Sequence, residues 1–349
     1  TVKHVVLSGM MAELKKALEE IGIAYFVFDG ITGEPTNVMI DEGIAAYKEN
    51  GCDFCIGIGG GSPLDSAKAI AAMITNEGKI ADYNGKVIEK PIPPVVAIPT
   101  TAGTGSEATQ FTVITDVEKD IKMLLKGGYL VPKIAIVDPA YTYSAPKSIT
   151  AATGMDALTH AIEAYTSRKA LPVTDTLAVS AVKRIMKYLP AVYKDGSDEK
   201  ARYEMSVASY EAGICINNST VTLVHGMSRP IGALFHVAHG ISNAMLLTKC
   251  LAFALDGAYE KFANLGREIG AATAEDDDKT ASEKFIEALN EICKICEIPT
   301  LLEYGIPKDE FFAHMEKMAH DALTSGSPGN TMKPISEQDI IEIYKKLWE

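Results

Sequence analysis

The sequence is poor in basic residues and in long apolar runs, and each shortage excludes a class of protein. Its 349 residues carry 33 Lys and Arg against 46 Asp and Glu, which gives a formal net charge of −13. This acidic balance argues against nucleic acid and anionic membrane surfaces as partners. No apolar stretch reaches the ~18 residues of a membrane-spanning helix and no signal peptide is recognised, so we expect a cytoplasmic protein. Because the chain begins at Thr1 rather than Met, we also expect residues before it.

Cysteine is also sparse, and its pattern gives no support for a disulfide or a zinc site. The six cysteines include two CxxC pairs, Cys52/Cys55 and Cys293/Cys296. Cys55 opens an apolar run that is typical of a buried strand, and the second pair follows the spacing of a buried helix face. In such places a free cysteine behaves as a small hydrophobe. We therefore predict reduced thiols, which suit the cytoplasm.

The length of the chain and its hydrophobic content of 47% favour two folded domains. In residues 1–145 short apolar runs alternate with amphipathic segments, the pattern of a mainly parallel, doubly wound α/β sheet that binds a nucleotide. We predict strands at 3–7, 24–28, 54–58, 95–99 and 134–138, and helices at 11–22 and 40–51. Residues 110–126 interrupt the alternation and predict a β-hairpin that turns at Asp116–Asp120. Residues 146–349 lack strand patterns and predict an all-α domain. We interpret it as the metal-binding domain, because it holds the candidate ligands Asp156, His160, His225 and His239.

A glycine-rich turn follows the strand predicted at residues 54–58, in the segment GIGGGSPLDSAKAIA. Gly59, Gly60 and Gly61 allow close backbone approach, and the free N–H groups at the start of the next helix suit a diphosphate. The run from Ser62 to Asp65 also resembles an N-cap, an N1 proline and a capping box. The loop alone therefore fits equally well a capped helix that binds no ligand. The ordinary GxGxxG fingerprint is absent.

A second loop rich in hydrogen-bond donors, PTTAGTGSEAT, follows the strand predicted at residues 95–99. Ligands of open α/β sheets bind at the carboxyl ends of the strands, where both loops are expected to lie. Two such loops at one edge of a sheet favour a dinucleotide over coincidence.

Four side chains in the second half of the chain form a candidate metal site. Asp156 and His160 lie four residues apart in a predicted helix and therefore share one of its faces. His225 and His239 form a second pair, whose spacing fits no zinc-finger pattern. One carboxylate with three imidazoles suits Fe(II), Zn(II), Co(II) or Ni(II) rather than calcium or magnesium. A ligand set without thiolates can keep a position open for a substrate oxygen.

With these segments in view, the chain resembles the iron-containing (group III) alcohol dehydrogenases over nearly its whole length. The resemblance is carried by GGGSPLDSAKA, IPTTAGTGSE, VDPAYTYSAPKSITAATGMDALTHAIEAY and the segment from His225 to His239. It implies NAD or NADP as the hydride carrier and Fe(II), with zinc able to replace it, on Asp156, His160, His225 and His239. It also implies cofactor contacts from the two loops and a lysine, and we predict Gly60, Gly61, Ser62, Asp65, Thr100, Thr101, Thr104 and Lys126.

Two departures from the family pattern bear on catalysis and on cofactor choice. A histidine that is usual in the family, four residues after the first ligand of the second pair, is replaced here by Arg229. A guanidinium stays charged and cannot relay protons at neutral pH. We therefore interpret Arg229 as a contact for substrate or cofactor, with His236 as an alternative relay residue. The turn after the first predicted strand lacks the acidic residue that usually selects NAD over NADP.

The resemblance implies metal-assisted hydride transfer between a nicotinamide cofactor and a short-chain alcohol or aldehyde, of the 1,3-propanediol, butanol or lactaldehyde type. A zinc-dependent glycerol dehydrogenase and a lyase like the dehydroquinate synthases share the fold, and the intact three-histidine set argues against both. A binding protein with a closed structural metal site would leave the nucleotide loops unexplained. We further expect a homo-oligomer, a dimer or larger.

Overall fold

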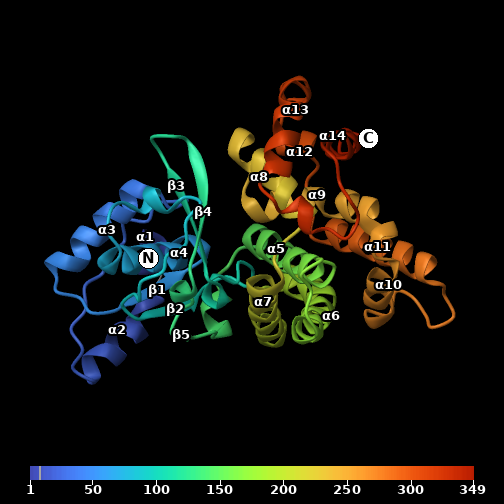
Figure 1. Cartoon of the computed structure of the whole chain (residues 1–349). Helices are drawn as coiled ribbons and strands as arrows, with labels where there is room; N and C mark the ends of the chain where they lie inside the picture. Colours follow the sequence, from blue (N-terminus) through green and yellow to red (C-terminus); the bar gives the residue numbers. More distant parts are fainter. Residues whose placement is uncertain (8) are drawn as a thin grey trace. The chain divides into compact units, whose positions relative to one another are not determined.

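The computed structural model describes residues 1–7 and 9–349, and the chain divides into two compact units. The first unit is Thr1–Thr142 and the second is Tyr143–Glu349, so the division falls three residues before the one expected at 145/146. The first unit is an α/β domain and the second is helical (Figure 1).

A three-stranded parallel sheet forms the centre of the first unit. Its strands lie in the order β1-β2-β5, with bounds Cys55–Gly59, Val95–Pro99 and Ile134–Ala135. Gly59 pairs with Pro99 at the carboxyl ends of β1 and β2. Because the two strands end at the same edge, the glycine-rich turn after β1 and the loop after β2 emerge side by side. The predicted α/β architecture with a parallel sheet is confirmed.

An antiparallel hairpin and two helices complete the core beside this sheet. The hairpin strands β3 (Phe111–Asp116) and β4 (Ile121–Lys126) pair from end to end, and Asp120 takes a left-handed φ of 53° in the turn. The hairpin packs against α3 (Asn37–Glu49) and α4 (Gly61–Thr75) through buried aliphatic side chains. The hairpin predicted in residues 110–126 is therefore present.

Three of the predicted strands are wrong in whole or in part. Residues 3–7 form the short helix α1 (Lys3–Leu7), which is followed by α2 (Met11–Glu20), and residues 24–28 adopt no regular structure. The strand expected at 134–138 is reduced to the two residues of β5. Short β-branched runs fit a strand or a helix equally well, and their tertiary contacts decide between them. Here Val5 of α1 is buried against Ile58 and Ile98 of the sheet.

The second unit is built from helices, as predicted. Their bounds are α5 Lys147–Tyr165, α6 Pro172–Lys194, α7 Glu199–Ser219, α8 Leu223–Phe235, α9 His239–Ala254, α10 Tyr259–Glu268, α11 Asp278–Ile295, α12 Leu301–Tyr304, α13 Lys308–Thr324 and α14 Glu337–Lys346. Helix α5 packs against α6, α7 and α9, and nearly all of its residues after the first turn are buried. An element enclosed on several sides can hold polar groups away from water, provided that they find partners.

Short 3₁₀ turns connect these elements, at Ile80–Tyr83, Ser106–Ala108, Gly128–Leu130, Pro139–Thr142, Leu255–Gly257 and Pro328–Asn330. The six cysteines are free thiols; Cys55 begins β1, and Cys296 is the C-cap residue that follows α11. Among the residues described, no helix combines the length and the hydropathy that crossing a membrane requires.

Candidate metal centre and nucleotide-binding loops

Helix α5 carries the first two candidate metal ligands on its enclosed face. Asp156 and His160 are one turn apart and are 3% and 5% exposed. The distance from Asp156 Oδ1 to His160 Nε2 is 3.8 Å. The spacing of four residues thus places both side chains on one helical face, as the sequence predicts.

The other two candidate ligands lie at the beginnings of neighbouring helices. His225 is in the first turn of α8, and His239 is the first residue of α9. Gly240, the next residue, brings α9 close to α5, because a Cβ atom there would collide with the carbonyl oxygen of Ala152. Close packing at this point carries His239 to the face of α5 that holds Asp156.

The four side chains converge on one small volume. One ligand atom from each of Asp156, His160, His225 and His239 lies within 4.8 Å of the others. Asp156 Oδ1 is 3.6 Å from Nε2 of His225 and 3.6 Å from Nε2 of His239. Atoms bound about 2.1 Å from a tetrahedral metal are about 3.4 Å apart, so the arrangement fits a transition-metal ion. Asp156, His160 and His225 are buried, whereas the side chain of His239 is 48% exposed.

The charges around the cluster favour a cation. Burial alone would raise the pKa of Asp156, but the imidazoles of His160, His239 and His225 hold it well below its usual range. A carboxylate that remains ionised in a buried site is a strong ligand for a divalent cation. The amide nitrogen of Asn243 is 2.7 Å from Asp156 Oδ1, 3.1 Å from His225 Nε2 and 3.2 Å from His239 Nε2. The amide of Asn243 therefore places a positively polarised N–H group against three of the candidate ligand atoms. A metal ion would present positive charge to the same atoms.

Sequence reasoning missed two residues beside this cluster. Asn243 lies one turn after His239 on α9, and Glu163 lies two turns after Asp156 on α5. Glu163 is fully buried and its carboxylate bonds to the ring of His225. Asn243 follows the ligand His239 by four residues, and Glu163 follows the ligand Asp156 by seven. Because residues at such spacings lie on the same face of a helix, the sequence held a signal for both.

The two residues proposed for proton transfer or substrate contact lie in different surroundings. Arg229 is on α8 one turn after His225, and its Nη1 donates a hydrogen bond of 3.0 Å to Ser327 Oγ. Burial lowers the pKa of His239 to about 4, and the charge of Arg229 is one of the smaller influences in the same direction. His236 is the C-cap residue after α8, with a left-handed φ of 53°; it is exposed and is not one of the four clustered ligands.

In the first unit, the two predicted nucleotide loops touch each other. The backbone N–H of Thr100 donates to the carbonyl oxygen of Gly59 over 2.8 Å, which joins the ends of β1 and β2. A Cβ atom on Gly61 would lie 3.0 Å from Thr104 Cγ2, whereas one on Gly60 would approach Thr101 no closer than 3.6 Å. The absence of a side chain at Gly61 thus keeps the second loop close to the start of α4.

The capping arrangement predicted from Ser62 to Asp65 is wrong. Helix α4 begins at Gly61, its N-cap is Gly60, and no side chain caps it. Gly60 is extended and is followed at once by helical backbone, so Ser62 falls inside the first turn. The helix therefore begins with glycines, and no capping side chain accepts a hydrogen bond from its first N–H groups. Such groups are the donors that a diphosphate binds.

Two further predicted cofactor residues have contrasting environments. Asp65 is partly buried; its Oδ1 accepts from Ser106 Oγ of the second loop, and its Oδ2 accepts from the backbone N–H of Val113 in β3. Lys126 is exposed at the end of β4, and its carbonyl oxygen accepts from the backbone N–H of Ile88. The side chain of Lys126 is therefore available to an outside group, whereas the carboxylate of Asp65 is already engaged.

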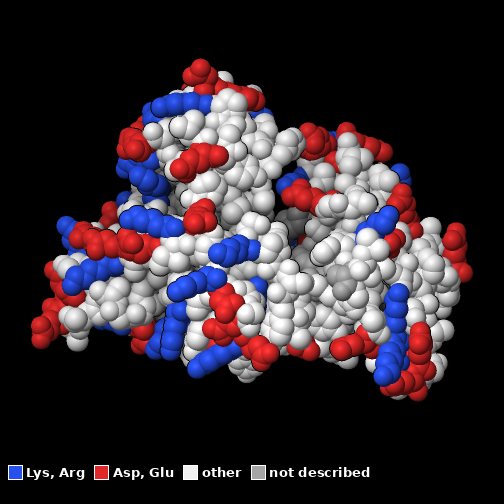
Figure 2. Space-filling model, turned by 180° about the vertical axis from the view of Figure 1, so that it is seen from behind, with Lys and Arg blue, Asp and Glu red and all other residues white. Residues whose placement is uncertain are grey.

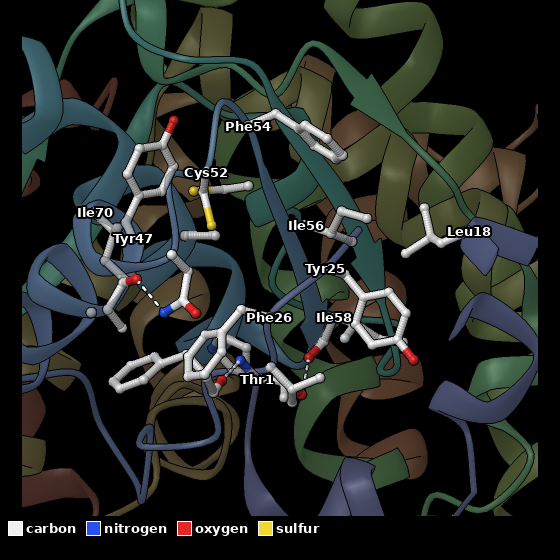
Figure 3. Close-up of a pocket in the computed structure, with 18 of the residues that line it drawn as sticks. Thr1, Leu18, Tyr25, Phe26, Tyr47, Cys52, Phe54, Ile56, Ile58 and Ile70 are labelled. Carbon is white, nitrogen blue, oxygen red and sulfur yellow. Dashed lines mark hydrogen bonds between the residues drawn. The ribbon is translucent and has the colours of Figure 1, made fainter. Parts of the chain in front are cut away.

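The first unit also contains a cavity of about 680 Å³, which Pro63 and Ser66 of the glycine-rich segment line in part. Figure 3 shows its apolar and aromatic lining, which includes Leu18, Tyr25, Phe26, Tyr47, Ile56 and Ile58. None of the predicted cofactor residues lines this cavity. On the face shown in Figure 2, basic and acidic side chains are interspersed.

Comparisons with known proteins assign both units of the chain to one protein family. A family described as iron-containing alcohol dehydrogenase matches residues 1–139, and its C-terminal domain family matches residues 150–348. The NAD-dependent methanol dehydrogenase of Bacillus methanolicus is 38% identical over 97% of this chain and 88% of its own length.

Solved structures give the same result. The crystal structure of a 1,3-propanediol oxidoreductase superimposes with a TM-score of 0.96 and 34% identity, over 99% of this chain and 90% of that one. The sulfoacetaldehyde reductase of Bifidobacterium kashiwanohense, solved in complex with NAD⁺, has a TM-score of 0.87 and 29% identity over 99% and 89% of the two chains.

Proposed function

Because the chain belongs to the iron-containing alcohol dehydrogenase family and is an oxidoreductase of alcohols and aldehydes, we propose that its cluster of one aspartate and three histidines holds iron(II). The observation that carries the proposal is the convergence of four ligand atoms within 4.8 Å. When bound, such an ion supplies Lewis-acid polarisation of a substrate oxygen. Zinc can replace iron in protein purified in air, since divalent zinc generally binds nitrogen and oxygen ligands more tightly than Fe(II).

The two loops of the first unit are proposed to bind the diphosphate of a nicotinamide dinucleotide. The uncapped first turn of α4 at Gly61 presents backbone N–H groups and the positive end of a 15-residue helix. Thr100, Thr101 and Thr104 add hydroxyl groups from the neighbouring loop. We propose NAD as the cofactor because the methanol dehydrogenase is NAD-dependent and the sulfoacetaldehyde reductase binds NAD⁺. Reduction rates with NADH and NADPH at equal concentration test this choice.

The substrate is proposed to be a short-chain alcohol or its aldehyde, in agreement with the substrates named for the similar methanol and 1,3-propanediol enzymes. Arg229 is proposed to contact a polar or anionic group of that substrate. Its guanidinium is permanently charged, lies one helical turn from His225 and is held by Ser327. The structurally similar sulfoacetaldehyde reductase is named for an anionic aldehyde, so an anionic aldehyde belongs among the substrates to be tried with this chain.

The test of this function is the absorbance of NADH at 340 nm with a panel of short neutral and anionic aldehydes and alcohols. We expect metal-dependent turnover that is lost with a chelator and restored by Fe(II). Glycerol oxidation that requires zinc would favour the zinc-dependent glycerol dehydrogenase instead. Metal binding without turnover of any alcohol or aldehyde would favour a lyase or a metal-binding protein.

We further propose a cytoplasmic homo-oligomer, a dimer or larger. The six free thiols support a reducing compartment. Light scattering coupled to size-exclusion chromatography measures the mass of the assembly, and a single species of 37.4 kDa would contradict the oligomer.

A further inference from the structure

Glu163 connects the metal-binding face of α5 to the beginning of α8. Its Oε1 accepts a hydrogen bond of 2.8 Å from Thr222 Oγ1 and one of 2.6 Å from the backbone N–H of Val224. Its Oε2 is 2.5 Å from His225 Nδ1. The carboxylate is fully buried, so these contacts take the place of water.

The first group of contacts fixes the start of α8. Thr222 is the N-cap residue of this helix, but its side chain does not accept a hydrogen bond from the first turn. Glu163 supplies the missing acceptor from another helix, and its negative charge lies at the positive end of the helix dipole. The position of the helix start, and with it the backbone of His225, therefore depends on α5.

The second contact fixes the ring of His225. A carboxylate can only accept a hydrogen bond, so Nδ1 of His225 must carry the proton. The other nitrogen, Nε2, is then free of a proton in the neutral ring and lies 3.6 Å from Asp156 Oδ1, on the side where the four ligand atoms meet. One carboxylate thereby selects both the tautomer and the orientation that metal binding requires.

We propose that Glu163 is a positioning residue for the metal centre, which sets metal affinity by orienting His225 while it caps α8. The inference rests on the proposed metal site, because it concerns how tightly that site binds an ion. It adds a buried carboxylate to the four ligands, with a role that does not require contact with the ion. Removing an outer partner of a ligating histidine typically weakens metal binding about 10- to 100-fold.

Glu163→Gln separates the two roles. The glutamine oxygen can still accept from Thr222 and Val224, which places its NH₂ group against His225 Nδ1. An amide NH₂ donates rather than accepts, so it favours the tautomer of His225 with the proton on Nε2. In that tautomer Nε2 has no lone pair with which to bind a metal. We expect the apo variant to fold with its helical content intact and to bind Co(II) or Zn(II) about 10- to 100-fold more weakly than the wild-type apoprotein.

The affinity of each apoprotein for Co(II) or Zn(II) is measured by competition with a chromogenic chelator. Circular dichroism of the same samples measures their folding. Glu211→Gln is the matched control, because it removes a partly buried carboxylate that accepts a hydrogen bond from Ser180 and forms an ion pair with Arg184, between α6 and α7. Thr222→Val removes one capping contact and leaves the contact to His225. Both controls should keep wild-type metal affinity.

A folded Glu163→Gln variant with wild-type affinity would overturn the inference, as would an equal loss of affinity in Thr222→Val. If Glu163→Gln does not fold, ¹⁵N NMR of the wild-type apoprotein decides, because without a metal on Nε2 it reports which ring nitrogen of His225 carries the proton beside Glu163. A proton on Nδ1 supports the inference, and an unprotonated Nδ1 overturns it. Failure of wild-type apoprotein to bind one ion would instead overturn the proposed metal site itself.

Discussion

Ser106 Oγ donates a hydrogen bond of 2.5 Å to Asp65 Oδ1, and this bond joins the loop after β2 to the first turns of α4. The other oxygen of Asp65 accepts from the backbone N–H of Val113, at the start of the hairpin. Both carboxylate oxygens are thus used within the first unit. We therefore propose that Asp65 positions the two loops for the cofactor rather than binding it directly.

Replacement of Ser106 by alanine should raise the KM for NAD several-fold without changing metal content. The variant loses one hydrogen bond to a partly buried carboxylate, a change of about 1.5–3 kcal/mol in the stability of the loop arrangement. Initial rates at varied NAD concentration measure the effect, and Ser197→Ala, an exposed serine of the second unit, is the control. A KM for NAD equal to that of the control would argue against a positioning role.

Gly61→Val should raise the KM for NAD more strongly, by at least about tenfold. A Cβ atom at this position already lies 3.0 Å from Thr104 Cγ2, and the further methyl groups must push the second loop away from α4. That displacement disturbs the N–H groups proposed to bind the diphosphate. Gly33→Val is the matched control in the same unit, because no atom lies within 4 Å of a Cβ atom there. Similar KM values for the two variants would show that the loop has no part in cofactor binding.

His225→Ala and His239→Ala should each reduce bound metal to background and abolish turnover, while the helical content persists. Either change leaves three ligands in a site built for four, and the lost imidazole is not replaced by another described ligand within the cluster. Elemental analysis gives the metal stoichiometry, and circular dichroism gives the helical content. His320→Ala, an exposed histidine on α13, should keep its metal. Full occupancy in His225→Ala would refute the assignment.

Arg229→Met should raise the KM for a small anionic aldehyde by about tenfold and leave that for propionaldehyde unchanged. A charge-assisted hydrogen bond to an anionic group is lost, whereas a neutral substrate has no such partner. Arg229→His tests the other role: if the position serves proton transfer, this variant should keep its rate and show a pH profile with a histidine pKa. Equal changes in KM for charged and neutral aldehydes would contradict the substrate contact.

The buried Lys68 predicts a rise in stability at alkaline pH. Burial lowers the pKa of its ammonium group from 10.5 to about 8, and the nearby carboxylates of Asp65 and Glu107 offset only part of this effect. Between pH 8 and 10.5 the unfolded chain therefore binds more protons at Lys68 than the folded one. The contribution of Lys68 to the free energy of unfolding should therefore rise with pH in that window, by up to about 1.4 kcal/mol per pH unit.

Urea unfolding of the wild-type protein and of Lys68→Met at pH 7.5, 8.5 and 9.5 measures this contribution. The difference in unfolding free energy should shift in favour of the wild-type protein as the pH rises. Lys48→Met, which removes an exposed lysine of α3, should show no such shift. A pH-independent difference for Lys68→Met would contradict the low pKa of the buried ammonium.

The sequence by itself determined the elements whose patterns are local. The strand β2 has the predicted bounds, and the hairpin has the predicted turn, because apolar runs bounded by turn residues leave few alternatives. Asp156 and His160 share a face of α5 because four residues make about one turn of any helix. Such features depend on neighbours within a few residues, so they can be recognised without the rest of the chain.

Tertiary structure alone decided the features that depend on distant residues. Residues 3–7 form a helix because Val5 is buried against strands that follow some 50 and 90 residues later. Ser62 became part of a helix rather than its cap because the chain turns at Gly60, where the loop from β2 lies against it. Neither contact leaves a periodic pattern in the sequence, so composition could not choose between the alternatives.

The same distinction holds at the candidate metal centre. The sequence offered two pairs of ligand-type side chains, but only the packing of α8 and α9 on α5 brought them within 4.8 Å of one another. In the sequence nothing distinguishes Glu163 from other helical glutamates. Only the fold places its carboxylate 2.5 Å from Nδ1 of His225, a residue 62 positions away in the sequence. Helical periodicity fixes which residues share a face, whereas the long-range packing of one helix on another fixes what that face meets.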